Sequence, residues 1–222
     1  MSDPSYVPDR RPISARNHPW SIAIARWLAQ TGVSPNAIST SGMIAAILAG
    51  VAFAGTSWLT PTWPLFLAAA VLMQLRLQAN MFDGMVAIQT ARASPVGELF
   101  NEVPDRVSDA AIFIGAGYAV GGMPELGYLA AVAALFTAYV RAEGKVAGAP
   151  QEFCGPMAKQ QRMALLTVAA LYAALPAAWQ PSSSALPDRG VIALALLIIA
   201  IGGAWTALRR LGRIARALRQ KG

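Results

Sequence analysis

Six apolar runs, separated by polar or basic connections, dominate this 222-residue sequence. They cover about 37–55, 63–79, 107–121, 126–142, 161–179 and 190–207. A helix needs about 20 apolar residues to cross roughly 30 Å of hydrocarbon, so each run is close to the length of a transmembrane span. Only 13% of the residues are charged, about half the share found in soluble domains. The sequence therefore predicts an all-α integral membrane protein with six transmembrane helices.

The basic residues are distributed unevenly between the two ends of the six expected spans. Of 18 Lys and Arg residues, 17 fall at the end that carries both termini, and only Arg189 falls at the other. Because cytoplasmic loops are enriched in Lys and Arg, this pattern predicts a bacterial-type inner (cytoplasmic) membrane protein with both termini cytoplasmic. The basic tail, 208–222, is expected to contact anionic membrane lipids. These bases lie beside spans and not in a basic domain interleaved with aromatic residues, which argues against a nucleic-acid partner.

A polar arm, residues 1–18, and a short amphipathic segment, residues 19–31, precede the first span. Large apolar side chains lie around one side of this segment: Ile22, Ile24, Trp27 and Leu28. The pattern predicts an interfacial helix in the headgroup plane, and an ordinary buried helix is an equal alternative. Ser34 can then cap the next helix, with Pro35 at its first position. The membrane domain is expected to cover 19–207.

The connection between the second and third spans carries oxygen ligands at helical spacing. The first set follows the i, i+3, i+4, i+7 pattern of one helix face: Asn80, Asp83, Gly84 and Ala87. The second set repeats every four residues: Gly97, Asn101, Asp105 and Asp109. Asp and Asn oxygens suit hard cations such as Mg²⁺ or Mn²⁺, which bind phosphates together with a few carboxylates. Two such helices facing each other can hold a cation between them, and the small residues leave room for a ligand.

The only histidine, His18, lies in the polar arm. Neither a Ser-His-Asp triad nor a His-ligated zinc site is expected, because both need a histidine placed among other site residues. This argues against a hydrolase or a zinc enzyme.

At these residues the sequence resembles the CDP-alcohol phosphotransferase family, whose signature reads D-x2-D-G-x2-A-R-x8-G-x3-D-x3-D. Five positions match the signature: Asp83, Gly84, Ala87, Gly97 and Asp105. Asn80 stands at the first Asp of the signature, Ile88 at its Arg and Asn101 at its third Asp. The chain thus resembles a divergent branch of the family, with Asn at two of the four signature Asp positions.

The resemblance implies a divalent-metal-dependent transferase of phospholipid biosynthesis. Such an enzyme moves a phosphatidyl-type group from a CDP-alcohol, such as CDP-diacylglycerol, to a hydroxyl acceptor and releases CMP. It also implies that Asp105 is the catalytic base, that one or two Mg²⁺ or Mn²⁺ ions are cofactors, and that the protein is a homodimer. The alternative is a catalytically inactive relative that binds nucleotide or lipid. The sequence leaves the acceptor open.

The resemblance also implies where the ligands of the metal and the phosphates lie. The metal ligands implied are Asn80, Asp83, Asn101, Asp105 and Asp109, with Glu98 and Glu102 near enough to restore charge lost at the two Asn positions. The phosphate-binding positions implied are Gly84, Ala87, Gly97, Arg76, Arg141, Lys159 and Arg162. Arg76 lies on the same helical face as Asn80 and can stand in for the Arg lost at Ile88, for which Arg92 is a weaker candidate. The alternatives are that Arg76 pairs with a carboxylate or reaches the interface, and that the later bases only set the topology.

Three glycines in the third expected span, Gly115, Gly117 and Gly121, favour close approach between helices. They fit the homodimer that the resemblance implies, and packing within one chain explains them equally well.

Overall fold

The computed structural model describes residues 14–91, 95–175 and 190–220, and every regular element in these ranges is a helix, as the sequence predicts. A 3-10 turn, η1 (Ser14–Asn17), is followed by α-helices. In chain order these are α1 (Pro19–Gln30), α2 (Pro35–Gly55), α3 (Trp63–Gln89), α4 (Pro95–Gly117), α5 (Pro124–Val146), α6 (Lys159–Ala173) and α7 (Val191–Arg219). Arg92, Arg189 and the side chain of Glu98 lie outside the described part of the chain.

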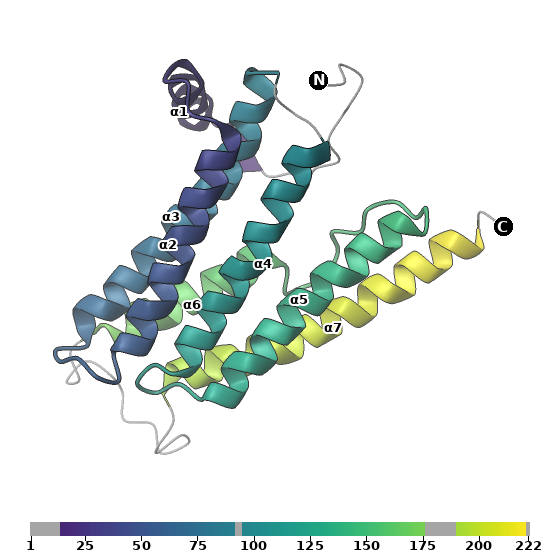
Figure 1. The fold of residues 1–222 in the computed structure, drawn as a ribbon. Coiled ribbons are helices and arrows are strands. Elements are labelled where there is room, and N and C mark those ends of the chain that lie inside the picture. Colours follow the sequence, from purple (N-terminus) through teal and green to yellow (C-terminus); the bar gives the residue numbers. More distant parts are fainter. Residues whose placement is uncertain (1–13, 92–94, 176–189, 221–222) are drawn as a thin grey trace.

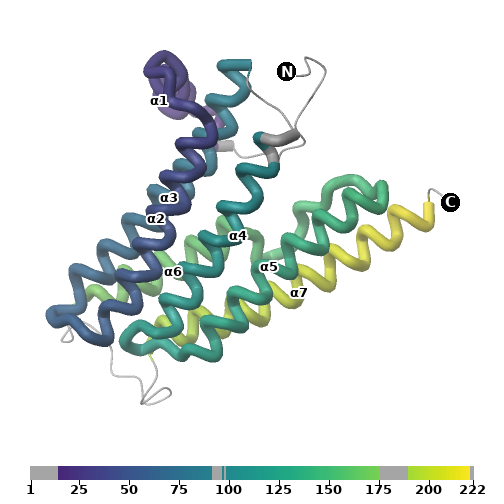
Figure 2. Tube along the Cα trace, in the orientation of Figure 1, coloured from purple at the N-terminus to yellow at the C-terminus, as the bar shows by residue number. Residues whose placement is uncertain are grey.

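The helices form two packed groups. Helix α2 packs on both α3 and α4, while α5 runs along α7 and also contacts α4 (Figure 1). Helix α6 packs against α3 and α7 and so joins the two groups. The α2–α3 and α4–α5 connections, 56–62 and 118–123, lie at one end, and α1 and the end of α7 lie at the other (Figure 2). The α5–α7 pair diverges from α4 toward this second end.

Glycines allow two of these helices to touch through their backbones. A Cβ added at Gly115 of α4 would lie 2.2 Å from the carbonyl oxygen of Gly50 in α2. A Cβ at Gly50 would lie 2.3 Å from the carbonyl oxygen of Ala111. No side chain fits at either position, so this contact fixes the spacing of α2 and α4.

The other two glycines of the expected third span also make contacts within the chain. Gly117 faces Gly127 of α5, where an added Cβ would lie 3.0 Å from the Gly127 Cα. Gly121 has a φ of +72° and lies against Gly190, just before α7. These glycines are used in packing within one chain, and the homodimer remains a prediction.

Four described helices are long and apolar enough to cross a membrane: α2, α3, α5 and α7. The chain is therefore a multi-pass membrane protein. Four of the six expected spans correspond to a helix that is long and apolar enough to cross a membrane. Helix α6 has only 15 residues, and α4 carries several charged side chains in its first half. The count of six spans therefore remains a prediction.

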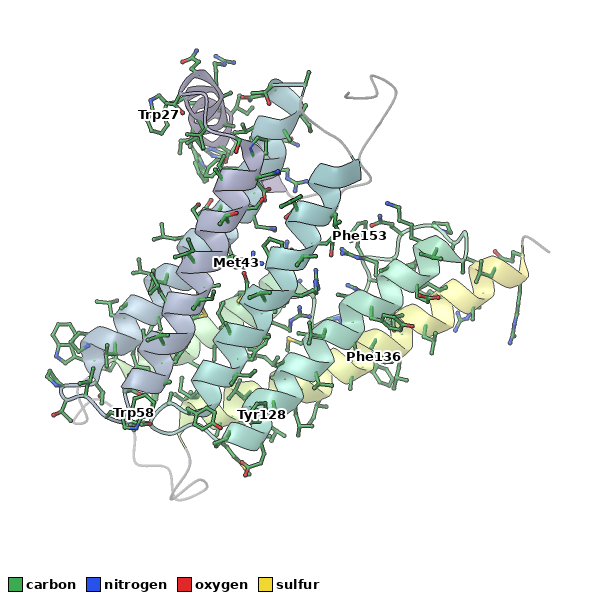
Figure 3. All side chains as sticks on the ribbon, viewed as in Figure 1. Trp27, Met43, Trp58, Tyr128, Phe136 and Phe153 are labelled. Atoms are coloured by element: carbon green, nitrogen blue, oxygen red, sulfur yellow. The ribbon has the colours of Figure 1, made fainter. Side chains whose placement is uncertain are left out.

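Aromatic side chains lie near both ends of the molecule. Figure 3 shows Trp27 at the end where α1 lies and Trp58 and Tyr128 at the opposite end. Trp58 is 77% exposed, although indole is large and mostly apolar. Trp and Tyr are enriched at the two membrane–water interfaces, so their positions agree with a membrane between these ends.

The chain enters the bundle through the helix start that the sequence predicts. The Ala37 N–H donates to the Ser34 Oγ at 3.1 Å, and Pro35 is the first residue of α2. Helix α1 lies across this end of the molecule (Figure 2). It buries Ala25 near Phe82 and Val86 of α3 and leaves Trp27 exposed. A helix over these residues is confirmed, and its place in the headgroup plane remains a prediction.

Candidate functional site

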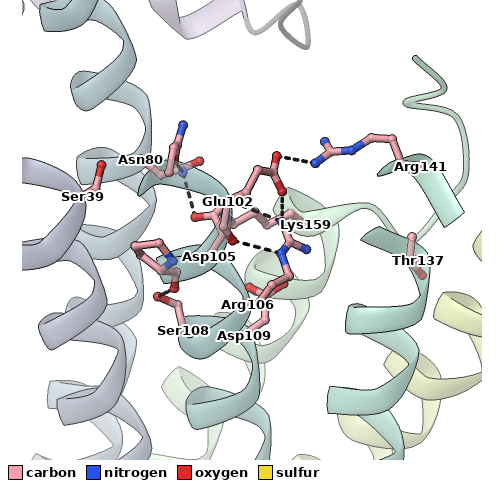
Figure 4. A network of polar contacts seen from close by, with 12 residues as sticks. Ser39, Asn80, Glu102, Asp105, Arg106, Ser108, Asp109, Thr137, Arg141 and Lys159 are labelled. Carbon is pink, nitrogen blue, oxygen red and sulfur yellow. Dashed lines mark hydrogen bonds and ion pairs between the residues drawn. The ribbon is translucent and has the colours of Figure 1, made fainter. Parts of the chain in front are cut away.

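Polar side chains from three helices line one recess, and Figure 4 shows several of them from close by. Helix α2 contributes Ser39, and α3 contributes Asn80 and Asp83. Helix α4 contributes Asn101 and Asp105. Two residues from each of the sets expected to face each other therefore line this recess, because α3 and α4 both pack on α2.

Asp83 is buried and hydrogen-bonded, with 3% of its surface exposed. Its Oδ2 accepts from the Ser39 Oγ at 2.6 Å, and its Oδ1 accepts from the N–H of Gly84. Within the described part of the chain, no Lys or Arg forms an ion pair with Asp83. A buried carboxylate without a cationic partner is costly, so this is the carboxylate most in need of a counter-ion.

Asp105 is held by cations from two other helices. The Arg76 guanidinium from α3 contacts its Oδ1, and the Lys159 ammonium from α6 contacts its Oδ2. Arg106 lies further away, at 3.8 Å from Oδ2. The sequence left open that Arg76 pairs with a carboxylate, and in the structure it does pair with Asp105.

Both members of the Asp105–Lys159 pair precede the apolar runs of their helices, and their charges influence each other. Burial raises the pKa of Asp105, but the Lys159 ammonium and the Arg76 guanidinium outweigh this effect and hold the pKa below its ordinary value. Burial lowers the pKa of Lys159 to about 8, although the Asp105 carboxylate opposes the change. At neutral pH the site therefore contains a carboxylate at Asp105 and an ammonium group at Lys159.

Asn80 bridges α3 and α4 through its amide nitrogen. Its Nδ2 donates to the Asp105 Oδ1 and to the Asn101 Oδ1, both at 2.9 Å. An ionised carboxylate only accepts hydrogen bonds, so the atom of Asn80 that faces Asp105 is the donor nitrogen. In this arrangement Asn80 does not present its oxygen to a cation beside Asp105.

A second ion-paired group lies on the side of the recess that faces α5. Glu102 accepts from Arg106 at 2.8 Å and also contacts Arg141 of α5 (Figure 4). The Arg141 guanidinium lies 5.5 Å from the ring centre of Phe153. Arg141 is therefore near the site, and it is paired with a carboxylate across the space between α4 and α5.

Asp109 and Arg162 form a buried pair one helical turn beyond Asp105. The Arg162 guanidinium lies 3.0 Å from the Asp109 Oδ2 and donates to the Met157 carbonyl oxygen at 2.9 Å. Neither residue is among those that line the recess. The pair ties α4 to α6, and the proposed role of Asp109 as a metal ligand remains a prediction.

The small residues of the expected ligand set are not among the residues that line the recess. Gly84 and Ala87 follow Asp83 on α3 and are buried, whereas Gly97 lies near the start of α4 and is half-buried. Their proposed contacts with a nucleotide remain predictions. Ser39 is a site residue that sequence reasoning missed, because nothing in the pattern of α2 links it to Asp83.

The arrangement of donors fits one hard cation better than two. Among the described residues, no three His, Cys, Asp or Glu side chains come together to hold a metal ion. Asp83 has the carboxylate and the burial that favour a cation, whereas both oxygens of Asp105 already contact cationic side chains. A single Mg²⁺ or Mn²⁺ at Asp83, completed by neutral oxygens and substrate phosphate, is compatible with this chemistry.

No protein-family model matches this chain, but its sequence is similar to those of three curated proteins. It is 27% identical over 198 residues to a phosphatidylinositol phosphate synthase of Streptomyces avermitilis, covering 86% of this chain and 76% of the relative. It is 24% identical over 154 residues to an archaetidylinositol phosphate synthase of Pyrococcus horikoshii, covering 68% and 77%. It is also 23% identical over 184 residues to the inner membrane protein YnbA of Escherichia coli, covering 83% and 85%.

The fold is similar to that of a solved enzyme. The phosphatidylinositol phosphate synthase PgsA1 of Mycobacterium tuberculosis with CDP-DAG bound matches with a TM-score of 0.68 and 18% sequence identity. The match covers 87% of this chain and 92% of that one. The same enzyme in complex with manganese and citrate matches with a TM-score of 0.70, covering 87% and 88%. At this level of identity the likeness concerns the fold.

Proposed function

We propose that this chain, as a member of the CDP-alcohol phosphotransferase family, transfers a phosphatidyl-type group from a CDP-alcohol to a hydroxyl acceptor and releases CMP; its similarity to two synthases of inositol-phosphate lipids supports this. The observation that carries this proposal is the meeting of Asp83 and Asp105, from two helices, in one recess with cationic side chains beside it. Such a site can bind phosphates and keep a carboxylate ready to accept a proton.

The proposed reaction follows from the chemistry of these groups. The acceptor oxygen attacks the phosphorus that bears the lipid alcohol, and the bond from this phosphorus to the bridging oxygen of the diphosphate breaks. CMP leaves with the bridging oxygen. Asp105 takes the proton of the acceptor hydroxyl, the role that the family resemblance implies. Its cationic neighbours keep it ionised and thus able to accept a proton, and they also weaken it as a base. A divalent ion at Asp83, when bound, would stabilise negative charge on the phosphates.

The relatives support a choice of donor and acceptors for a first test. CDP-DAG is bound in the PgsA1 structure, and two relatives are named as synthases of inositol-phosphate lipids. We therefore expect a CDP-diacylglycerol-type donor and place inositol phosphate first among the acceptors. Glycerol phosphate, serine and a lipid hydroxyl complete the set.

The test is CMP release by the purified full-length protein from CDP-diacylglycerol, with Mg²⁺ or Mn²⁺ and the pooled acceptors. We expect CMP release that depends on the metal and falls by about 100-fold or more in Asp105→Ala, the loss typical of a removed general base. Glu125→Ala is the matched control, because Glu125 is an exposed carboxylate in the first turn of α5.

Equal CMP release by Asp105→Ala and the control would reject the assigned base. If the protein binds CDP-diacylglycerol but releases no CMP with either metal and the full set of acceptors, the alternative is favoured: an inactive relative that binds nucleotide or lipid.

A further inference from the structure

Two cationic side chains contact the carboxylate of Asp105, one at each oxygen. Arg76 of α3 and Lys159 of α6 provide these contacts, and Figure 4 shows Lys159 beside Asp105. Arg76 is 2% exposed, and its ion pair is therefore shielded from water. Both positive charges are fixed in place by the packing of the helices.

The charges of the recess are already balanced without an ion. Asp83 and Asp105 bring two negative charges, and Arg76 brings one positive charge. Lys159 does not line the recess but brings the second positive charge by contacting Asp105. Asn80 and Asn101 are neutral. Two divalent ions would add four positive charges to a buried and balanced group, and like charges at close range in such an environment repel strongly.

The amide of Asn80 reinforces this distribution. Its nitrogen faces Asp105, at 2.9 Å from Oδ1. An amide N–H carries partial positive charge, so it repels a cation placed between Asn80 and Asp105. Together with Arg76 and Lys159, it makes this side of the recess favourable for an anion.

Arg76 also has unpaired hydrogen-bond donors. Within the described part of the chain, its Nε and Nη1 are buried and have no hydrogen-bond partner. Buried donors are almost always paired in folded proteins, so two unpaired donors in a side chain that lines a recess indicate a missing acceptor. Guanidinium groups bind phosphate oxygens in a bidentate manner, which matches two free donors.

We propose that Arg76 and Lys159 bind the diphosphate of the CDP-alcohol directly, and that the site takes no more than one divalent cation, at Asp83. This inference rests on the proposed function for the chemical class of its ligand. The fixed cations then supply positive charge that a second ion would otherwise bring.

The first measurement is the number of Mn²⁺ ions bound by the purified full-length protein with CDP-diacylglycerol, followed by electron paramagnetic resonance. We expect at most one bound Mn²⁺ per chain. Two bound Mn²⁺ ions per chain would overturn the proposal. This count uses the unaltered protein, so it stands even if substitution of the buried Arg76 prevents folding.

The second measurement is the affinity for CDP-diacylglycerol in Arg76→Gln and Lys159→Gln. We expect a loss of roughly 10- to 100-fold in each, the effect of removing a hydrogen bond to a charged group. Arg76→Lys retains the charge and should lose less. Lys145→Gln, an exposed lysine at the end of α5, is the matched control and should leave the affinity unchanged. Unchanged affinity in both Gln variants would also overturn the proposal.

These readouts separate this inference from the proposed function, because neither needs turnover. Binding that depends on Arg76 and Lys159, without any CMP release, would reject the transferase and keep the inference. CMP release together with two bound Mn²⁺ ions would do the reverse.

Discussion

The hydrogen bond from Ser39 to Asp83 is the contact on which the buried state of that carboxylate most depends. Ser39→Ala removes it and leaves Asp83 with the Gly84 N–H alone. We expect the free energy of unfolding to fall by about 1.5–3 kcal/mol, as for other hydrogen bonds to charged groups. Ser41→Ala is the control, because Ser41 is exposed on the same helix and its Oγ donates to the Ile38 carbonyl oxygen of that helix. Thermal or denaturant unfolding in detergent measures both, and equal stability would contradict the role assigned to Ser39.

Single residues also show where sequence reasoning reaches its limit. Helical spacing predicts that Asn80 and Asp83 share one helix face and that Asn101 and Asp105 share another, because that depends on local geometry alone. The Ser39–Asp83 bond joins residues 44 positions apart, and the Lys159–Asp105 pair joins α6 to α4. Such contacts depend on how helices are rotated against one another, which spacing within one helix does not determine.

The α2–α4 contact through Gly50 and Gly115 sets the distance between two of the elements that build the site. Gly115→Ala places a Cβ 2.2 Å from the Gly50 carbonyl oxygen, so the helices must separate. We expect a loss of stability of about 1–3 kcal/mol or more, typical of overpacking, and reduced CMP release. Gly212→Ala is the control, because no atom lies within 4 Å of its added Cβ. It should be neutral or stabilising by up to about 1 kcal/mol, since Ala favours helix over Gly.

At the scale of helices, hydropathy predicted the fold class and the approximate place of each element. The apolar runs at 37–55 and 126–142 lie within α2 and α5. Helices α3 and α4 extend well beyond their runs, because their polar turns are stabilised by hydrogen bonds and ion pairs with other helices and do not need lipid. Hydropathy registers only the apolar part of such a helix.

The whole molecule has one cysteine, which offers a direct test of its orientation in the membrane. Cys154 is a partly exposed free thiol in the α5–α6 connection, at the end that the basic residues predict to be cytoplasmic. We expect a membrane-impermeant maleimide to label it in inverted vesicles and not in intact spheroplasts. In the control, Cys154→Ser combined with Ser57→Cys at the opposite end should reverse the pattern. Labelling of Cys154 from outside intact cells would contradict the predicted topology.

Helix α7 has 29 residues, which at 1.5 Å per residue is about 43 Å, longer than the roughly 30 Å of hydrocarbon in a bilayer. Its last turns therefore extend past the acyl chains, and a groove there is lined by Arg209, Arg213 and Arg216, with Glu152 paired to Arg213. A positive surface attracts anionic lipids by about 1 kcal/mol for each basic residue near the headgroups. A CDP-linked lipid is itself anionic. We therefore expect the local concentration of the proposed CDP-alcohol donor around this helix to exceed its average in the bilayer, so that the donor would reach the site from the plane of the membrane.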